Sequence, residues 1–144
     1  MNVFFICTGN TCRSPMAEAI LTAKKLPGVE VRSAGIYAGH APISANAGMV
    51  LDGQGIEFDH TSKPLQNGDL KWATIILTMT VSHKNILLQN YPEAAGKLFT
   101  LKEFVNGTEA DVSDPYGGSL GTYQNTFNEL NELISKLAEK LDNG

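Results

Sequence analysis

Apolar positions along the chain fall into two kinds of pattern, short continuous runs and longer stretches with helical spacing. The continuous runs predict buried strands over residues 3–6, 29–33, 74–78 and 97–100. The helical spacing predicts helices over residues 15–25, 44–54, 81–90 and 121–141, with a weakly helical segment over residues 69–73. Because strands and helices alternate, the pattern predicts an α/β fold with a parallel sheet covered on both faces.

Three of the expected helices have a recognisable apolar face. The first is expected to place Met16, Ala19, Ile20 and Ala23 on one side. The second would turn Ala47, Val50 and Leu51 inward. The last has a long stripe made of Tyr123, Phe127, Leu130, Ile134, Leu137 and Leu141. We interpret this stripe as core packing rather than as a surface for a partner.

Length and composition narrow the class of protein. The chain has 144 residues, 42% hydrophobic and 18% charged, which is typical of one soluble domain, so residues 1–144 are expected to form a single domain. The first apolar run is too short for a signal peptide or a membrane span. A net charge of −4 without a basic run gives no indication of nucleic-acid or membrane binding. We expect a cytoplasmic protein, and a monomer is the simplest state for this size.

The most informative stretch is Cys-Thr-Gly-Asn-Thr-Cys-Arg-Ser, residues 7–14, directly after the first apolar run. Pro15 suits the first turn of a helix, so a tight loop should join a strand to a helix N-terminus. Backbone N–H groups of such a loop, together with the helix end, can surround a phosphoryl group. Arg13 offers a planar fork for two phosphate oxygens, and the same positive field favours the thiolate form of Cys7. The stretch therefore predicts attack of Cys7 on phosphorus.

Other residues of this loop fit the same interpretation. Gly9 permits a positive φ and close approach of the backbone to a ligand, and Asn10 tolerates the left-handed conformation. Ser14 could cap the helix or turn its hydroxyl toward the Cys7 sulfur. The alternative is that Cys7 is a buried strand residue, Ser14 only a cap, and Arg13 solvated.

The motif Cys-x-Gly-Asn-x-Cys-Arg-Ser-Pro, with Asp-Pro-Tyr at residues 114–116, resembles the low-molecular-weight protein tyrosine phosphatase family. The resemblance extends over essentially the whole chain and includes Val-Arg-Ser-Ala-Gly at residues 31–35. It implies a doubly wound, four-stranded parallel sheet with helices on both faces. It also implies a phosphatase that works through a phosphocysteine and needs no metal or other cofactor. The residues expected to contact the substrate are Thr8, Gly9, Asn10, Thr11, Cys12, Ser14 and Tyr116.

Asp114 is the candidate acid of this reaction. Thiolate attack expels a leaving group that must be protonated, and in the second step the same carboxyl would activate water. Pro115 stiffens the backbone beside Asp114, and the two glycines at 117 and 118 permit a loop that leans over a pocket. Taken alone, Asp-Pro is a common turn former. Asp111 is the other candidate acid nearby, but it is not followed by a proline and an aromatic residue.

The resemblance also implies a hydrogen-bond network that holds the loop rigid. Its members would be Asn10, Ser14, Ser33 and His60. Read alone, His60 would be an ordinary surface or core histidine. His40 and His83 carry no functional signal in the sequence.

Thr11 is the residue that indicates which phosphorylated side chain is the substrate. Most members that hydrolyse phosphotyrosine carry a branched apolar residue at this position, whereas Thr11 resembles the protein-arginine-phosphatase branch, as does the Gly-Gly-Ser sequel at residues 117–119. A more polar wall suits a planar guanidinium better than a phenyl ring. The predicted substrate is therefore protein phosphoarginine. The alternative is phosphotyrosine, with Thr11 a neutral variant.

Cys12 has two interpretations, a redox partner of Cys7 and a small buried residue. A reversible disulfide would protect Cys7 from irreversible oxidation while switching activity off.

Two further classes of protein remain as alternatives: a thioredoxin-coupled arsenate reductase and a phosphate-binding module without turnover. The reductase relays electrons through later cysteines, and none follows Cys12. The module would not need Cys7, Ser14 and Asp114 together. The arginine branch implies bacterial stress control, opposite a protein arginine kinase, with phosphorylated proteins as partners.

Overall fold

A four-stranded parallel sheet organises the molecule, and the computed structural model describes residues 1–143 of the chain. The strands are β1 (Asn2–Cys7), β2 (Glu30–Gly35), β3 (Ile75–Thr78) and β4 (Leu98–Thr100). Their order is β2-β1-β3-β4, and each neighbouring pair is parallel. The chain therefore winds outward from β1 in both directions, which confirms the doubly wound sheet expected from the sequence.

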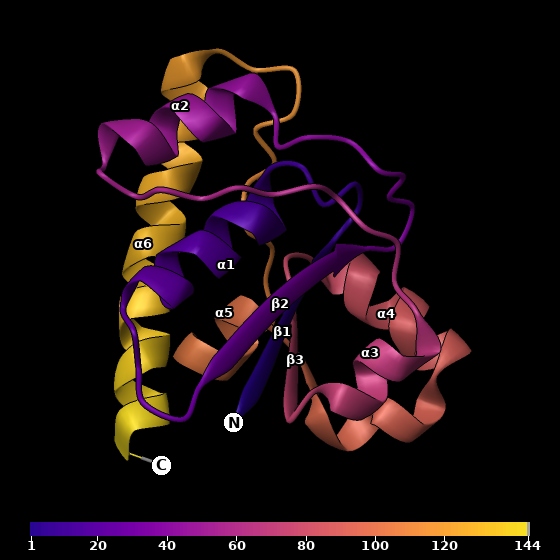
Figure 1. The fold of residues 1–144 in the computed structure, drawn as a ribbon. Coiled ribbons are helices and arrows are strands. Elements are labelled where there is room, and N and C mark those ends of the chain that lie inside the picture. The colour runs from indigo at the N-terminus through magenta and orange to yellow at the C-terminus, as the bar shows by residue number, and fades with distance from the viewer. Residues whose placement is uncertain (144) are drawn as a thin grey trace.

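Helices cover both faces of this sheet (Figure 1). On one face lie α1 (Arg13–Ala23), α2 (Ala45–Gly53), α5 (Leu101–Asn106) and α6 (Leu120–Asn143). On the other lie α3 (Asn67–Trp72), α4 (Val81–Asn90) and the 3₁₀ helix η1 (Pro92–Lys97). This arrangement confirms the two covered faces that the alternation of strands and helices predicts.

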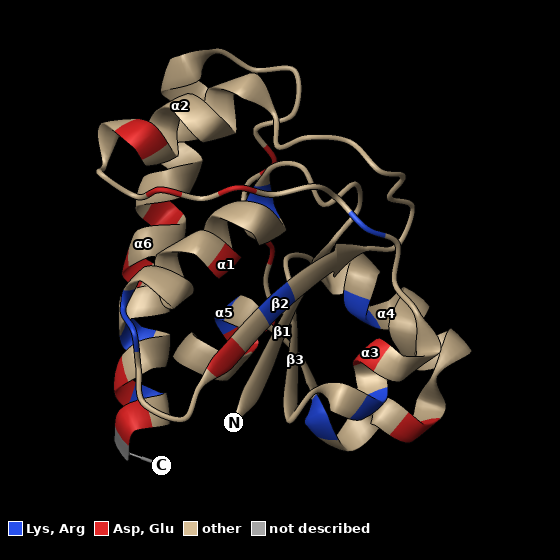
Figure 2. Ribbon diagram, viewed as in Figure 1, with Lys and Arg blue, Asp and Glu red and all other residues tan. Residues whose placement is uncertain are grey.

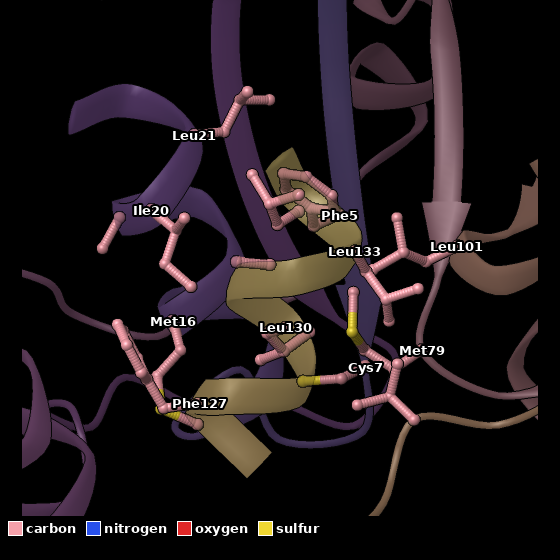
Figure 3. Close-up of a cluster of buried hydrophobic side chains, with 14 of the residues drawn as sticks. Phe5, Cys7, Met16, Ile20, Leu21, Met79, Leu101, Phe127, Leu130 and Leu133 are labelled. Carbon is pink, nitrogen blue, oxygen red and sulfur yellow. The ribbon is translucent and has the colours of Figure 1, made fainter. Parts of the chain in front are cut away.

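The side chains of β1 divide between two hydrophobic cores. Val3, Phe5 and Cys7 face the core formed with α1 and α6, and Phe4 and Ile6 face the core formed with α3 and α4. Figure 3 shows the first core, where side chains from β1, α1 and α6 point toward one another. A strand buried on both faces has no polar alternation, which explains why the run over residues 3–6 is apolar throughout.

The strand register brings three carboxyl ends to the same edge of the sheet. Cys7 pairs with Gly35 of β2, and Ile6 pairs with Thr78 of β3. The loop over residues 8–12, the turn after β2 and the N-terminus of α4 all leave from this edge. In open parallel sheets this edge is the usual place for a ligand.

The expected helices are present, with shifted ends. The first begins at Arg13 rather than at residue 15, because Cys12 takes the N-cap position. Ala23, expected on its buried face, is exposed; Ala17 and Leu21 are buried instead. The stripe of α6 lies in the core as expected.

Two short elements, η1 and α5, lie outside the set that the sequence pattern predicted. Helix α5 begins with reciprocal hydrogen bonds between Thr100 and Glu103, and its C-cap is Gly107, whose φ is 81°. With six residues it is too short to produce a helical period of its own. Within residues 1–143, no helix combines the length and the apolar character needed to cross a membrane.

Candidate active site

The loop over residues 8–12 follows β1 and surrounds a pocket of about 240 Å³ at the edge of the sheet. The pocket is lined by Cys7, Thr8, Gly9, Thr11, Cys12, Arg13, Asp114 and Tyr116. The structure thus brings together the predicted residues of the N-terminal motif and those of the distant Asp-Pro-Tyr motif. Asn10 in this loop and Ser14 at the start of α1, which were expected to contact the substrate, are fully buried.

The Cys7 sulfur lies at the floor of this pocket and accepts hydrogen bonds. The backbone N–H of Asn10 donates to it at 3.2 Å, and the Ser14 hydroxyl lies 2.8 Å away. Asn10 Nδ2 donates to the Ser14 oxygen at 2.8 Å, so the single Ser14 proton is free to point at the sulfur. Ser14 therefore faces Cys7 and does not cap α1. Both contacts hold the sulfur in a fixed position in the pocket.

Asn10 holds the loop in shape. Its φ is 56°, in the left-handed region, as the sequence suggested. Its side chain donates to Ser33 at 2.9 Å and accepts from the Lys63 N–H at 3.1 Å. Its carbonyl accepts from His60 Nε2 at 2.9 Å. Gly9 differs from expectation, because its φ is not positive and the left-handed turn falls on Asn10 alone.

Gly35, at the end of β2, lies directly against the loop. A Cβ atom there would be 2.6 Å from the Thr8 carbonyl oxygen and 3.0 Å from the Asn10 nitrogen. Both neighbours are backbone atoms, which cannot rotate away as a side chain can. The close approach of β2 to the loop therefore requires glycine at this position.

Arg13 and Asp114 meet across the mouth of the pocket. Arg13 is buried, and it donates to the Val112 carbonyl at 3.2 Å and lies 3.7 Å from the Asp114 carboxylate. Asp114 is largely exposed and accepts from the Tyr116 N–H at 3.0 Å. Figure 2 shows a basic segment at the start of α1 and acidic segments along the chain that leads into α6. Asp111, the rival acid, instead accepts from the N–H of Val81 at the start of α4.

The remaining pocket residues differ in how firmly they are held. Cys12 is buried, and its sulfur lies 3.4 Å from the Tyr123 hydroxyl and 3.6 Å from Ser44 Oγ. Burial, followed by the contact with Cys12, raises the pKa of Tyr123, so this hydroxyl stays protonated. Thr11 is half-buried in the pocket wall. Tyr116 stands at the rim with 82% of its surface exposed.

Two residues near the site were missed by the sequence reasoning. Glu18 on α1 accepts a short hydrogen bond from Ser33 and lies 4.0 Å from His60 Nδ1. Burial raises the pKa of Glu18, despite the hydrogen bond from Ser33. Its signal in the sequence was a charged residue within the apolar part of the first helix, one turn after Ser14.

His83, on α4, is the second missed residue. Its Nε2 atom lies 2.8 Å from the Thr8 hydroxyl. Its signal was its position in the first turn of the helix after β3, at the ligand-binding edge of the sheet. Among residues 1–143, no group of three or more histidine, cysteine or acidic side chains is arranged to hold a metal ion.

Comparisons with known proteins agree with this geometry. A family model described as low molecular weight phosphotyrosine protein phosphatase matches residues 2–144. A protein-arginine-phosphatase from Geobacillus stearothermophilus is 51% identical over 140 residues, which cover 96% of this chain and 95% of that protein. The structure of the YwlE arginine phosphatase from the same organism has a TM-score of 0.97 at 50% identity, covering 99% of this chain and 93% of the other.

A low molecular weight protein tyrosine phosphatase from T. tengcongensis is equally similar in sequence. Its structure has a TM-score of 0.92 at 52% identity, covering 97% of this chain and 99% of the other. The family is thus shared by all these relatives, although their printed substrates differ. The chain belongs to the low molecular weight phosphotyrosine protein phosphatase family.

Proposed function

We propose that this protein hydrolyses phosphoarginine in proteins, with Cys7 as nucleophile, Arg13 as the phosphate-binding residue and Asp114 as acid and base. The observation that carries the proposal is the position of Thr11, whose side chain lies in the wall of the pocket that ends at the Cys7 sulfur. A hydroxyl there can hydrogen-bond to a guanidinium N–H, whereas a branched apolar side chain would leave that N–H unpaired.

The reaction proceeds in two balanced steps. In the first, the Cys7 thiolate forms a bond to phosphorus while the P–N bond breaks, and Asp114 gives its proton to the departing nitrogen. Arg13 holds two phosphoryl oxygens as charge develops on them. In the second, Asp114 takes a proton from water, the oxygen bonds to phosphorus, and the S–P bond breaks. Inorganic phosphate leaves and the thiolate is restored.

Asp114 is suited to this exchange by its surroundings. Its carboxylate lies at the pocket mouth, opposite the floor where Cys7 sits, and it is exposed to water that could attack in the second step. In the substrate complex it can also accept from a guanidinium N–H. One carboxylate therefore serves both the leaving group and its recognition.

Phosphotyrosine is the second candidate substrate. The exposed Tyr116 ring at the rim favours it, because an aromatic side chain can stack against a phenyl ring entering the pocket. The two candidates share every step at phosphorus and differ only in the atom that Asp114 protonates.

The experiment that tests the proposal compares kcat/KM on one peptide that carries phosphoarginine or phosphotyrosine at the same site. We expect a ratio above about ten in favour of phosphoarginine, equivalent to about 1.4 kcal/mol of transition-state discrimination. Replacing Thr11 by isoleucine should reduce this ratio by at least about tenfold, while Thr11→Ser, which keeps the hydroxyl, should preserve it. A ratio near or below one in the unaltered protein would reject the preference for phosphoarginine and return the enzyme to the tyrosine-phosphatase class, with Thr11 a neutral variant.

The biological setting is also a proposal. A cytoplasmic monomer that acts on phosphorylated proteins, in opposition to an arginine kinase during stress, fits a composition without basic runs and a single folded unit. Reversible oxidation of Cys7 to a disulfide with Cys12 would let the same enzyme respond to oxidants.

A further inference from the structure

The Thr8 side chain lies between two hollows of the surface. It lines the pocket above Cys7, and it also lines an adjoining hollow of about 520 Å³ with His83 and Tyr37. Thr8 is exposed, but its hydroxyl is not free to rotate, because Oγ1 is 2.8 Å from His83 Nε2. The direction of this hydrogen bond decides what the hydroxyl can offer a ligand.

His83 is held rigidly in the first turn of α4. Only 6% of its surface is exposed, and its backbone N–H donates to the Thr80 hydroxyl at 3.1 Å. Burial, followed by the nearby charge of Arg13, lowers the pKa of His83 from 6.5 to about 4. At neutral pH the imidazole is therefore uncharged and carries a single N–H.

The surroundings of the ring determine which nitrogen carries that proton. Nδ1 of His83 is buried and has no hydrogen-bond partner in the part of the chain that the structure describes. A proton on Nδ1 would be a buried donor without an acceptor, which costs more than a buried lone pair. The proton therefore resides on Nε2, and His83 donates to the Thr8 oxygen.

We propose that His83 is a positioning residue that fixes the Thr8 hydroxyl as a hydrogen-bond donor to a phosphoryl oxygen. The Thr8 oxygen already accepts from His83, so its own proton is the group left to point into the pocket. Thr8 follows Cys7 directly in the chain, and both residues line the pocket in which the bond to phosphorus would form. The inference rests on the proposed phosphatase function but not on the preference for phosphoarginine.

The test uses the full-length enzyme, with p-nitrophenyl phosphate as substrate and inorganic phosphate as inhibitor. Thr8→Val removes the hydroxyl at nearly constant shape, and Thr8→Ser keeps it. His83→Leu removes the donor, and His83→Gln keeps an amide N–H near the position of Nε2. The double variant Thr8→Val/His83→Leu shows whether the two residues act through one another. A cooperative thermal unfolding transition in each variant shows that the variant is folded.

We expect Thr8→Val and His83→Leu each to lower kcat/KM and to weaken phosphate inhibition by about tenfold or more. Thr8→Ser and His83→Gln should stay within about threefold of the unaltered enzyme, and the double variant should lose no more than either single variant. This rescue pattern would not arise from a general loss of packing.

Several results would overturn the inference. Losses that multiply in the double variant would mean that His83 does not act through Thr8. Equal losses in Thr8→Ser and Thr8→Val would assign the effect to packing. If His83→Leu does not fold, unchanged phosphate inhibition in Thr8→Val is by itself enough to reject the inference. Absence of any turnover by the unaltered enzyme would reject the phosphatase function itself, and phosphate binding to the same variants by calorimetry would still decide the role of Thr8.

Discussion

Individual side chains of the pocket divide into those fixed by several hydrogen bonds and those left free to change partner. Cys7 is buried, and its sulfur has two hydrogen-bond contacts. Asp114 is exposed, and its carboxylate lies 3.7 Å from the Arg13 guanidinium, which is a loose contact. A nucleophile benefits from a fixed position, and a group that both gives and takes a proton needs contact with substrate and water. The two residues therefore occupy the environments that their proposed roles require.

Removing the proton of Asp114 should separate substrates by leaving group. We expect Asp114→Asn to lower kcat about a hundredfold or more on a phosphoarginine peptide, but less than tenfold on an activated aryl phosphate that leaves without protonation. Steady-state kinetics on the two substrates measure this. Asp111→Asn is the matched control, since its carboxylate accepts from Val81 instead. Equal losses on both substrates would remove Asp114 from the role of acid.

The proposed redox role of Cys12 is also a property of single residues, because it depends on one disulfide bond to Cys7. With mild hydrogen peroxide, the Cys7 thiolate should be oxidised to a sulfenic acid. The Cys12 thiol then attacks the Cys7 sulfur, the S–O bond breaks, and a disulfide and water are formed. Mass spectrometry should show a loss of about 2 Da that a thiol reductant reverses, together with recovered activity. Cys12→Ser should instead lose activity irreversibly. A protein whose activity returns equally well without Cys12 would exclude the redox role.

At the scale of elements, strand β2 and the loop over residues 8–12 form one unit. The Thr8 carbonyl accepts from the Tyr37 N–H, and Gly35 packs against the loop backbone at a distance that leaves no room for a Cβ atom. The turn after β2 therefore supports the loop from the side opposite α4. This contact joins segments far apart in sequence, so local patterns gave no indication of it.

Replacing Gly35 by alanine should move the loop while leaving the fold intact. We expect kcat/KM on p-nitrophenyl phosphate to fall at least about tenfold, because the new methyl group displaces the backbone of Thr8 and Asn10. Gly39→Ala is the matched control, since a Cβ at Gly39 meets no atom within 4 Å. Wild-type rates in Gly35→Ala would show that the loop tolerates the displacement.

At the scale of the whole molecule, burial of a neutral histidine links stability to pH. The folded-state pKa of His83 is about 4 and its ordinary value is 6.5, so the unfolded chain binds more protons in between. Stability should therefore fall as the pH falls from 6.5 toward 4, by about 3 kcal/mol from this residue.

Urea unfolding at several pH values measures this slope. His83→Gln should make the slope shallower, since glutamine does not titrate. His40→Gln is the control, because His40 is exposed. An unchanged slope in His83→Gln would mean that His83 is not the source of the acid sensitivity.

Much of this architecture was predictable from the sequence, and the remainder has physical reasons. Apolar periodicity located the four strands and the helices that cover them, because both depend on local burial patterns. The short helix α5 was not predicted, although the Thr100-x-x-Glu103 pattern of a capping box was present. Its six residues were too few for the period to be recognised.

The site shows the same division. The motif of residues 7–14 and the Asp-Pro-Tyr motif placed the pocket, because their chemistry is local. Glu18 and His83 were missed, since each acts through tertiary contacts, with Ser33 and with Thr8. The sequence showed that Gly9 permits a positive φ and that Asn10 tolerates one, and only the fold shows that Asn10 is the one of the two that adopts it.

The central position of β1 has a consequence for the timing of synthesis. Cys7 is synthesised before Asp114, which contacts Arg13, and before Tyr123, which contacts Cys12. The neighbour β3 must also be made before β1 is bonded on both edges. A nascent chain in which Asp114 has not yet been made therefore carries the thiol without its complete pocket, so dephosphorylation requires that translation has passed this residue.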